Sequence, residues 1–459
     1  MSKKRNHSTL NRDAAFVYGG YFLRYLSLVV LIPYYGRVLG PAAYGKVLAA
    51  MSLMSIVWLV VNYGFSITGA RELASVRDVV DRGRIYGRQI VARFMLVPVG
   101  ILVGAVGTVM SPVLVSDWRY GVLATTLGLV EAFNLGWFFQ GISQFRTSMA
   151  IEAMSYPLNL ILVLLLVRNA TDGVFVMFSL LTSSVFCIAF SYCIAARTIR
   201  ILPQGFADGW SEIKSSGVIF IQTVNSILMT SGATYALSVF STPEQVSYFG
   251  TADRFIALGL SLLGPAGQIL MPTISNIYLD DRPRAIELVR KGLLWESGFG
   301  LIVLLVGLLL SPFLIPLILG EKFDGSIRVL QILACMVPFA AFSHALGLYL
   351  FVPLRREKLL IIAISVGSLV NLGLAVFAAQ AWGSVGMAAS RVAGEVVVAV
   401  VLAVIALRIG FGTLLLQPDS DRDLGDGAVP GSDAGPDHRP GGICTGNGKE
   451  PVTGDQVSS

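Results

Sequence analysis

The sequence predicts an all-α membrane protein with about twelve transmembrane helices and short loops. Of its 459 residues, 54% are hydrophobic and 14% are charged, whereas a soluble globular protein has about 25% charged residues. The mean hydropathy is +0.72. The apolar residues come in blocks of roughly 17–25, the length that a helix needs to cross a hydrocarbon core of about 30 Å. These blocks do not alternate with polar residues, so they indicate helices and not barrel strands.

Block length places the predicted spans, because the lipid-facing and core-facing sides of such helices are both apolar. The spans cover residues 14–33, 46–67, 91–111, 119–139, 148–167, 174–195, 216–240, 252–275, 292–318, 329–352, 359–380 and 386–408. The first apolar stretch contains Arg24 and is followed by no small-residue cleavage site. We therefore expect a retained first span and not a signal peptide.

The basic residues predict the topology. Most of the 34 Lys and Arg residues lie in the two terminal tails and in one set of alternate loops. Because positive loops stay in the cytoplasm, both termini are expected there, which requires an even number of spans. The net charge of +6 comes from these loop and tail residues. They form no basic stripe that would indicate a nucleic-acid partner.

The two halves of the chain resemble each other weakly. The turn GPAAYGK after the first span has a counterpart, TPEQVSYFGTADR, after the seventh, with Tyr44 and Tyr248 in corresponding places. Six spans per half predict two lobes related by a pseudo-twofold axis along the membrane normal, with a cavity between them. The predicted organisation is a cytoplasmic N-terminal tail at 1–13, an N-lobe at 14–200, a cytoplasmic linker at 201–215, a C-lobe at 216–410 and a disordered cytoplasmic tail at 411–459.

Four segments resemble motifs of the Wzx-type polysaccharide flippases, which belong to the exporter superfamily of the multidrug (MATE) transporters. They are RVLGPAAYG at 37–45, NYGFSITGARE at 62–72, LGEKFDGSIRVLQIL at 319–333 and WGSVGMAASRVAGE at 382–395. Each motif alone is weak evidence, but the four occur in the family's order, and the resemblance as a whole covers residues 10–410. The resemblance implies a MATE-like fold.

For function, the resemblance implies export of an undecaprenyl-diphosphate-linked oligosaccharide for O-antigen, capsule or exopolysaccharide synthesis. The cargo would pass from the cytoplasmic to the periplasmic leaflet of a bacterial inner membrane by alternating access. The implied partners are this lipid-linked glycan, membrane lipids, a polysaccharide polymerase and a chain-length regulator.

No catalytic residue and no metal site is expected. Cys187, Cys193, Cys335 and Cys444 show no metal-ligand spacing, and the chain has no G-x-x-x-x-G-K-[ST] loop for a nucleotide. No cofactor is therefore expected, although the carboxylates within spans leave a coupling proton or cation open.

Charged residues within spans are expensive to bury, so each is a functional candidate. We predict Arg24 and Arg254 as substrate-binding residues, because a guanidinium donates two parallel hydrogen bonds to a diphosphate. Alternatively, Arg24 is a buried partner of Glu131 or Asp253, and Arg254 reaches the membrane interface.

Glu131, Glu152 and Glu296 are candidates for binding a coupling ion. A gating or structural role is predicted for Arg37, Arg71, Arg391 and Glu395, of which the last two form an i,i+4 pair that can neutralise itself. His344 is expected to make a hydrogen bond between helices.

Two other functions stay open. A multidrug antiporter of the same superfamily would carry a membrane-embedded Asp in its first span, where this chain has Arg24. A membrane polysaccharide polymerase or ligase would need a large periplasmic loop, whereas every predicted outer loop is short.

Overall fold

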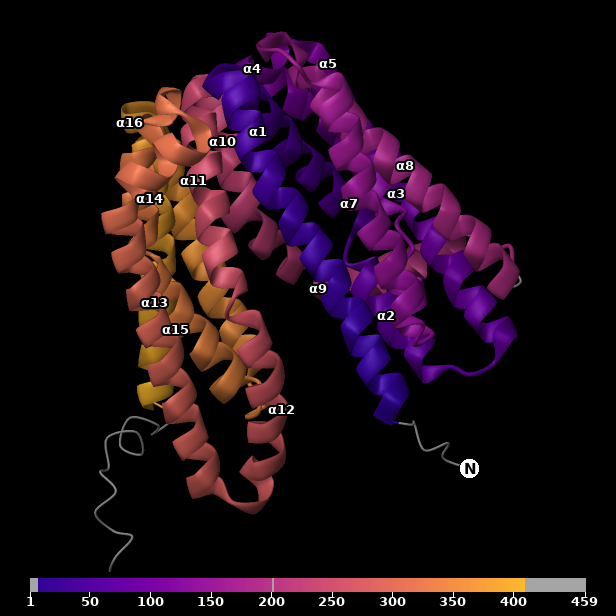
Figure 1. Ribbon diagram of the computed structural model, residues 1–459. Helices are drawn as coiled ribbons and strands as arrows, with labels where there is room; N and C mark the ends of the chain where they lie inside the picture. Colours follow the sequence, from indigo (N-terminus) through magenta and orange to yellow (C-terminus); the bar gives the residue numbers. More distant parts are fainter. Residues whose placement is uncertain (1–6, 200–201, 409–459) are drawn as a thin grey trace, which may run out of the picture. The chain divides into compact units, whose positions relative to one another are not determined.

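The computed structural model describes residues 7–199 and 202–408, and every regular element in these ranges is helical (Figure 1). These residues belong to one compact unit. The predicted tail at 411–459 lies outside the described ranges. The N-terminal half consists of α1 (His7–Asn62), α2 (Phe65–Ser75), α3 (Val79–Met110), α4 (Pro112–Val115), α5 (Trp118–Ala132), α6 (Gly136–Gly141), α7 (Phe145–Leu166), η1 (Ala170–Asp172) and α8 (Gly173–Thr198).

The C-terminal half contains two short π-helical segments among its α-helices. Its elements are α9 (Phe206–Ile227), η2 (Leu228–Gly232), α10 (Ala233–Phe240), α11 (Pro243–Ser261), α12 (Gly264–Asp280), α13 (Arg282–Leu319), η3 (Glu321–Phe323), α14 (Gly325–Ala334), α15 (Val337–Leu346), η4 (Gly347–Phe351) and α16 (Glu357–Arg408). Each predicted span falls on these helices, which confirms the all-helical membrane fold. By length and composition, eight helical segments among the described residues can cross a membrane, so the number twelve stays a prediction.

The first predicted span and most of the second lie in α1, which reverses direction at Gly40. This residue has φ 70° and ψ 175°, a backbone conformation that glycine adopts without a clash at Cβ. The ring centroids of Tyr35 and Tyr44 lie 5.6 Å apart, although nine residues of straight helix would advance about 13.5 Å. The chain therefore turns back without a separate loop.

The last two predicted spans form a similar hairpin in α16, with its turn at Gly383 (φ 57°, ψ −130°). A Cβ on Gly386 would lie 2.0 Å from the carbonyl oxygen of Ala378, and one on Gly367 would lie 2.7 Å from that of Gly394. Glycines thus allow the two arms of α16 to approach at backbone distance.

Two predicted boundaries run into helices. Helix α1 begins at His7, inside the predicted N-terminal tail, and α9 begins at Phe206, inside the predicted linker at 201–215. The start of α9 is stabilised by Asp208, whose Oδ2 accepts a hydrogen bond from the backbone N–H of Gly205 over 2.9 Å. A capping carboxylate in the first turn favours a helix here.

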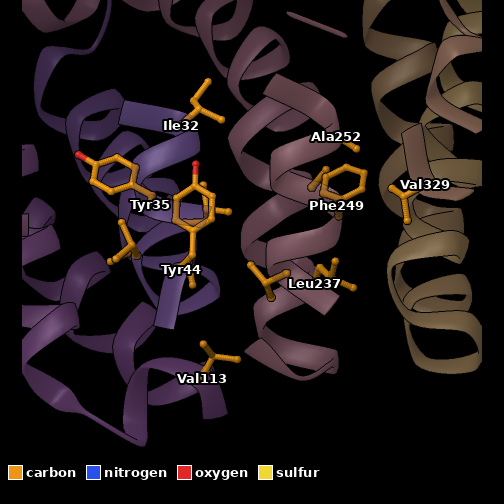
Figure 2. Close-up of a cluster of buried hydrophobic side chains, with 14 of the residues drawn as sticks. Ile32, Tyr35, Tyr44, Val113, Leu237, Phe249, Ala252 and Val329 are labelled. Atoms are coloured by element: carbon orange, nitrogen blue, oxygen red, sulfur yellow. The ribbon is translucent and has the colours of Figure 1, made fainter. Parts of the chain in front are cut away.

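The largest hydrophobic cluster, here called the common core, joins the two halves. It combines residues from α1, α4 and α5 with residues from α10, α11, α13, α14 and α16. Figure 2 shows Tyr35 and Tyr44 of α1 next to each other, with Leu237 and Phe249 of the same cluster on neighbouring helices. The common core lies at the end of the bundle that carries the turn at Gly40.

Toward the opposite end, each half has a core of its own. The cluster around Tyr86, Trp137 and Ile199 contains N-terminal residues only, and the cluster around Tyr349 and Leu402 contains C-terminal residues only. A small cluster of Phe65, Ala92 and Ile213 connects the start of α9 to α2 and α3. The halves are thus joined broadly at one end and narrowly at the other.

Candidate functional site

A cavity of about 410 Å³, here called the central cavity, lies between α1, α7 and α8 of the N-terminal half and α11 of the C-terminal half. It is lined by apolar side chains and by a few polar ones. The polar lining residues are Ser27, Tyr35, Tyr156, Asn159, Arg254 and Ser261.

Arg254 lines the central cavity, as one of the two sequence-based alternatives expected. Its Nη1 donates a hydrogen bond to the Tyr44 hydroxyl over 2.8 Å, and its Nη2 lies 3.0 Å from the sulfur of Met51. The guanidinium carbon is 5.7 Å from the centroid of the Tyr44 ring, a cation–π contact. Within the described ranges, no ion pair joins Arg254 to a carboxylate. A cationic group thus stands at the boundary of the two halves, and its role in substrate binding stays a prediction.

Arg24 lies in α1, but its side chain is outside the described part of the structure. Its position is three and seven residues before Ser27 and Leu31, which both line the central cavity. Residues with these spacings share one face of a helix. Position 24 is therefore on the cavity face of α1, and substrate binding by Arg24 stays a prediction.

A second cavity of about 280 Å³, here called the serine chamber, lies inside the N-terminal half between α5, α6, α7 and α8. Its lining includes five serines: Ser148, Ser155, Ser183, Ser184 and Ser191. It also contains two of the predicted ion-coupling residues, Glu131 and Glu152. Ser184 donates a hydrogen bond to Glu131, and the Tyr156 hydroxyl donates one to Glu152 over 3.0 Å.

The serine chamber and the central cavity are neighbours. Tyr156, Asn159 and Leu180 line both. The side-chain oxygen of Asn159 is buried and has no hydrogen-bond partner among the described residues. An unused buried acceptor therefore lies where the two cavities meet.

A third cavity, of about 460 Å³, lies inside the C-terminal half between α9, α15 and α16. Arg391, Glu395 and His344 line this C-terminal cavity. Arg391 interacts electrostatically with Glu395 and with Asp253 of α11. Nevertheless its Nε and Nη1 are buried without a hydrogen-bond partner in the described structure. The predicted pair therefore faces a cavity, and its gating or structural role stays a prediction.

Glu296 lies in α13 beside the C-terminal cavity and is fully buried. It accepts a hydrogen bond from the Tyr349 hydroxyl, and its Oε2 lies 2.8 Å from Nδ1 of His344. His344 joins α13 to α15, which confirms the hydrogen bond between helices that was expected of it. Since His344 also lines the cavity, it connects a buried carboxylate to an open space.

Arg37 and Arg71, from the first two family motifs, do not line any of these three cavities. Arg37 is exposed, and its Nη2 donates a hydrogen bond to the carbonyl oxygen of Leu317 over 2.5 Å, so it ties α1 to α13. Arg71 is exposed on α2. The gating or structural role of Arg37 and Arg71 stays a prediction.

Two buried charges were missed from the sequence. Arg93 counted among the basic loop residues, yet it is fully buried in α3. Its guanidinium donates to the carbonyl oxygens of Ala132 and Gln89, over 2.8 and 3.1 Å, and stacks on Trp137 with 5.1 Å to the ring centroid. Its place inside the predicted span at 91–111 was the available signal.

Glu212 lies in the predicted linker, and its side chain is 1% exposed. Its Oε2 pairs with Nε of Arg88 over 2.6 Å, and its Oε1 accepts a hydrogen bond from Gln89 over 2.7 Å. Arg88 also pairs with Glu72 of α2. Burial, and then the charge of Glu72, raises the pKa of Glu212, while Arg88 opposes this shift. No sequence pattern indicated that a linker carboxylate would be buried on α3.

Comparison with known proteins gives consistent matches along most of the chain. The family model for polysaccharide biosynthesis proteins matches residues 10–278. A protein named as an O-antigen transporter in Shigella dysenteriae is 22% identical over 394 residues, which cover 82% of this chain and 94% of that protein. A protein of the same name in Escherichia coli K12 is 23% identical over 370 residues, which cover 77% and 86%.

Solved structures show the same fold. The lipid II flippase MurJ in an inward closed conformation aligns with a TM-score of 0.66, 14% identity, and coverage of 88% of this chain and 90% of that one. An inward-facing MATE multidrug transporter of the MOP superfamily aligns with a TM-score of 0.62, 16% identity, and coverage of 84% and 95%. At these identities the likeness concerns the fold, and it confirms the MATE-like architecture expected from the sequence.

Proposed function

Because the chain belongs to the family of polysaccharide biosynthesis proteins, we propose that it is a flippase for an undecaprenyl-diphosphate-linked oligosaccharide. Its cargo is a repeat unit of O-antigen, capsule or exopolysaccharide, moved from the cytoplasmic to the periplasmic leaflet of a bacterial inner membrane. The relatives named as transporters agree with a function in transport and not in catalysis. A polysaccharide polymerase and a chain-length regulator are the proposed partners, because they use the delivered glycan.

The position of Arg254 carries this proposal. A diphosphate brings negative charge into a membrane-embedded cavity, and the charged side chain described in the central cavity is a guanidinium. An arginine presents parallel donors that match phosphate oxygens. The same arginine disfavours the cationic cargo of a multidrug antiporter, because like charges repel in a weakly screened site.

The distribution of the cores supports alternating access. With both termini in the cytoplasm, the common core lies on the periplasmic side, and the two separate cores lie on the cytoplasmic side. This arrangement corresponds to an inward-facing state that receives cargo from the cytoplasm. Rocking of the halves would break the common core and admit the cargo to the other side.

A coupling proton at Glu296 is part of the proposal. The carboxyl is fully buried, and His344 stands between it and the C-terminal cavity. A buried acid that reaches an open cavity through an imidazole is a suitable place to take up and release a proton. Ion coupling at Glu131 and Glu152 stays a prediction of the same kind.

The test is deletion of the gene, followed by complementation and measurement of surface polysaccharide. We expect the deletion to abolish the polysaccharide and wild type to restore it. Arg254→Gln and Arg24→Ala should restore it poorly, because losing hydrogen bonds to a charged group weakens binding by about 1.5–3 kcal/mol each. Arg119→Gln is the matched control, since Arg119 is 68% exposed and lies outside the cavities. Unchanged polysaccharide after the deletion contradicts the function. Full restoration by both cavity variants contradicts the site assignment alone.

A further inference from the structure

We propose that the serine chamber is the binding site for the saccharide end of the cargo and recognises the hydroxyl groups of a pyranose ring. This inference rests on the proposed flippase function and divides its ligand into two parts. The diphosphate binds at Arg254 in the central cavity, and the sugar that follows it enters the chamber.

The lining of the chamber suits a polyhydroxylated ligand. Each of the five serine hydroxyls already donates its proton to a protein oxygen, so it offers a ligand only its lone pairs, and the carboxylates of Glu131 and Glu152 add further acceptors for the hydroxyl donors of a sugar. A carboxylate has room for about four hydrogen bonds, and the hydrogen bond from Ser184 occupies one place on Glu131. Hydrogen bonds from sugar hydroxyls to these carboxylates are charge-assisted and therefore strong.

The junction between the cavities brings the two parts of the ligand together. Both spaces are lined by Tyr156, Asn159 and Leu180, so the chamber lies next to a ligand held at Arg254. The oxygen of Asn159, 8% exposed as a residue, is an unsatisfied acceptor at this point. A hydroxyl of the first sugar would supply the missing donor, since buried polar groups are normally paired.

The size of the chamber limits what it accepts. Its 280 Å³ lies just below the range of about 300–1,000 Å³ typical of small-ligand sites. Such a space holds the sugar nearest the diphosphate and not the whole repeat unit. Specificity is then expected for the first sugar, while the rest of the glycan lies outside the chamber.

A metal cation fits the chamber less well. Hard cations need six or more oxygen ligands within about 2.6 Å, whereas Glu131 and Glu152 already have separate hydroxyl partners. No group of three His, Cys, Asp or Glu side chains suited to a metal occurs in the described ranges. A coupling proton on Glu131 is the remaining competitor, and the experiment separates it from sugar binding.

The experiment compares two probes on the purified full chain in detergent by isothermal titration calorimetry. The probes are farnesyl diphosphate and farnesyl diphosphate linked to N-acetylglucosamine. We expect wild type to bind the glycosylated probe about tenfold more tightly. Glu131→Gln should reduce this ratio toward one without weakening the binding of farnesyl diphosphate. Asn159→Leu should also reduce the ratio, at a residue that lines both cavities.

The two control variants replace hydrogen-bonding residues that lie outside the chamber. Ser179 of α8 bonds the Phe175 carbonyl and is not part of the lining, and Glu357 is exposed at the start of α16. Ser179→Ala and Glu357→Gln should keep the ratio of wild type. If Glu131→Gln does not purify as a folded protein, Ser184→Ala tests the same carboxylate by removing its donor.

Each outcome decides between the assignments. A wild-type ratio of one, or a tenfold ratio that persists in both chamber variants, overturns the saccharide site. A ratio that persists in Glu131→Gln while the pH dependence of binding disappears assigns Glu131 to proton coupling instead. Arg254→Gln should weaken both probes equally. If wild type binds neither probe, the proposed function itself fails.

Discussion

Nη1 of Arg254 in α11 lies 2.8 Å from the hydroxyl oxygen of Tyr44 in α1. This hydrogen bond connects the arginine of the central cavity to the turn where α1 reverses direction. Tyr44 is fully buried in the common core, so the cationic group and the contact between the halves depend on the same side chain. Binding of an anion at Arg254 would therefore compete with the hydrogen bond to Tyr44 and disturb the common core.

Replacing Tyr44 by Phe tests this link. The variant keeps the ring in the core and removes the acceptor, so the free energy of unfolding should fall by about 1.5–3 kcal/mol, the range for hydrogen bonds to charged groups. In a double-mutant cycle, Tyr44→Phe and Arg254→Gln should show coupling. Tyr34→Phe is the matched control, because Tyr34 donates to the Val167 carbonyl and not to Arg254. Its coupling to Arg254→Gln should be near zero, and equal coupling in both cycles would contradict the link.

Arg93→Met should destabilise the N-terminal half. The variant leaves the carbonyl oxygen of Ala132 and the side-chain oxygen of Gln89 without their donors. Removing one member of a buried charged network costs about 3–5 kcal/mol. Thermal unfolding in detergent measures the loss. Arg84→Met is the control, since Arg84 is 63% exposed and its replacement should stay within about 0.5 kcal/mol. Equal losses for the two variants would contradict a structural role for Arg93.

Glu212 should make stability depend on pH. It precedes the predicted span at 216–240, and its pKa is raised above the ordinary value of 4.5 by burial and by Glu72. A carboxyl with a raised pKa in the folded state contributes its full stability below pH 4.5 and loses it as the pH rises through the raised value. The melting temperature should therefore fall across this window, and Glu212→Gln should remove that fall. Glu72→Gln should move the window to lower pH, and a slope unchanged in both variants would refute the assignment.

Glu296→Gln should uncouple transport from a proton gradient. In proteoliposomes with a fluorescent lipid-linked sugar, we expect wild type to respond to an imposed pH difference and Glu296→Gln to transport at one rate with or without it. His344→Gln should slow the response, because the imidazole connects Glu296 to the cavity. Glu357→Gln, at an exposed position, should respond like wild type. A normal response of Glu296→Gln would exclude this carboxyl from coupling.

Gly45→Ala should weaken the contact between the two halves at the common core. A Cβ at this position would lie 1.8 Å from the carbonyl oxygen of Pro243 at the start of α11, so α1 and α11 must separate. Overpacking of this kind costs about 1–3 kcal/mol. In a chain whose native cysteines are replaced, a cysteine at the buried Val246 should react faster with an impermeant maleimide when Gly45→Ala is present. Gly217→Ala is the control, because a Cβ there meets nothing within 4 Å. An unchanged labelling rate would show that the contact does not hold this end closed.

The helices were predictable because the length of an apolar block alone determines whether it can cross a membrane. The sequence predicted separate spans on either side of Gly40 and Gly383, but it did not reveal that each pair forms one continuous helical hairpin, because that depends on the backbone conformation of a single glycine. The cavity position of Arg254 was one of two open alternatives, because both faces of its helix are apolar in sequence. The burial of Arg93 and Glu212 depends on partners such as Ala132 and Arg88, which lie tens of residues away, so no local pattern reveals it.

Helix α9 has a consequence for dividing the chain into two polypeptides. Its residues follow the predicted N-lobe in sequence, yet Ile213 packs on Phe65 and Glu212 pairs with Arg88, so its first turns belong physically to the N-terminal half. A break in the segment just before Phe206 would leave each fragment with intact helices. The start of α9 would then act as a docking arm of the second fragment, and the Arg88–Glu212 pair would become a contact between two separate chains.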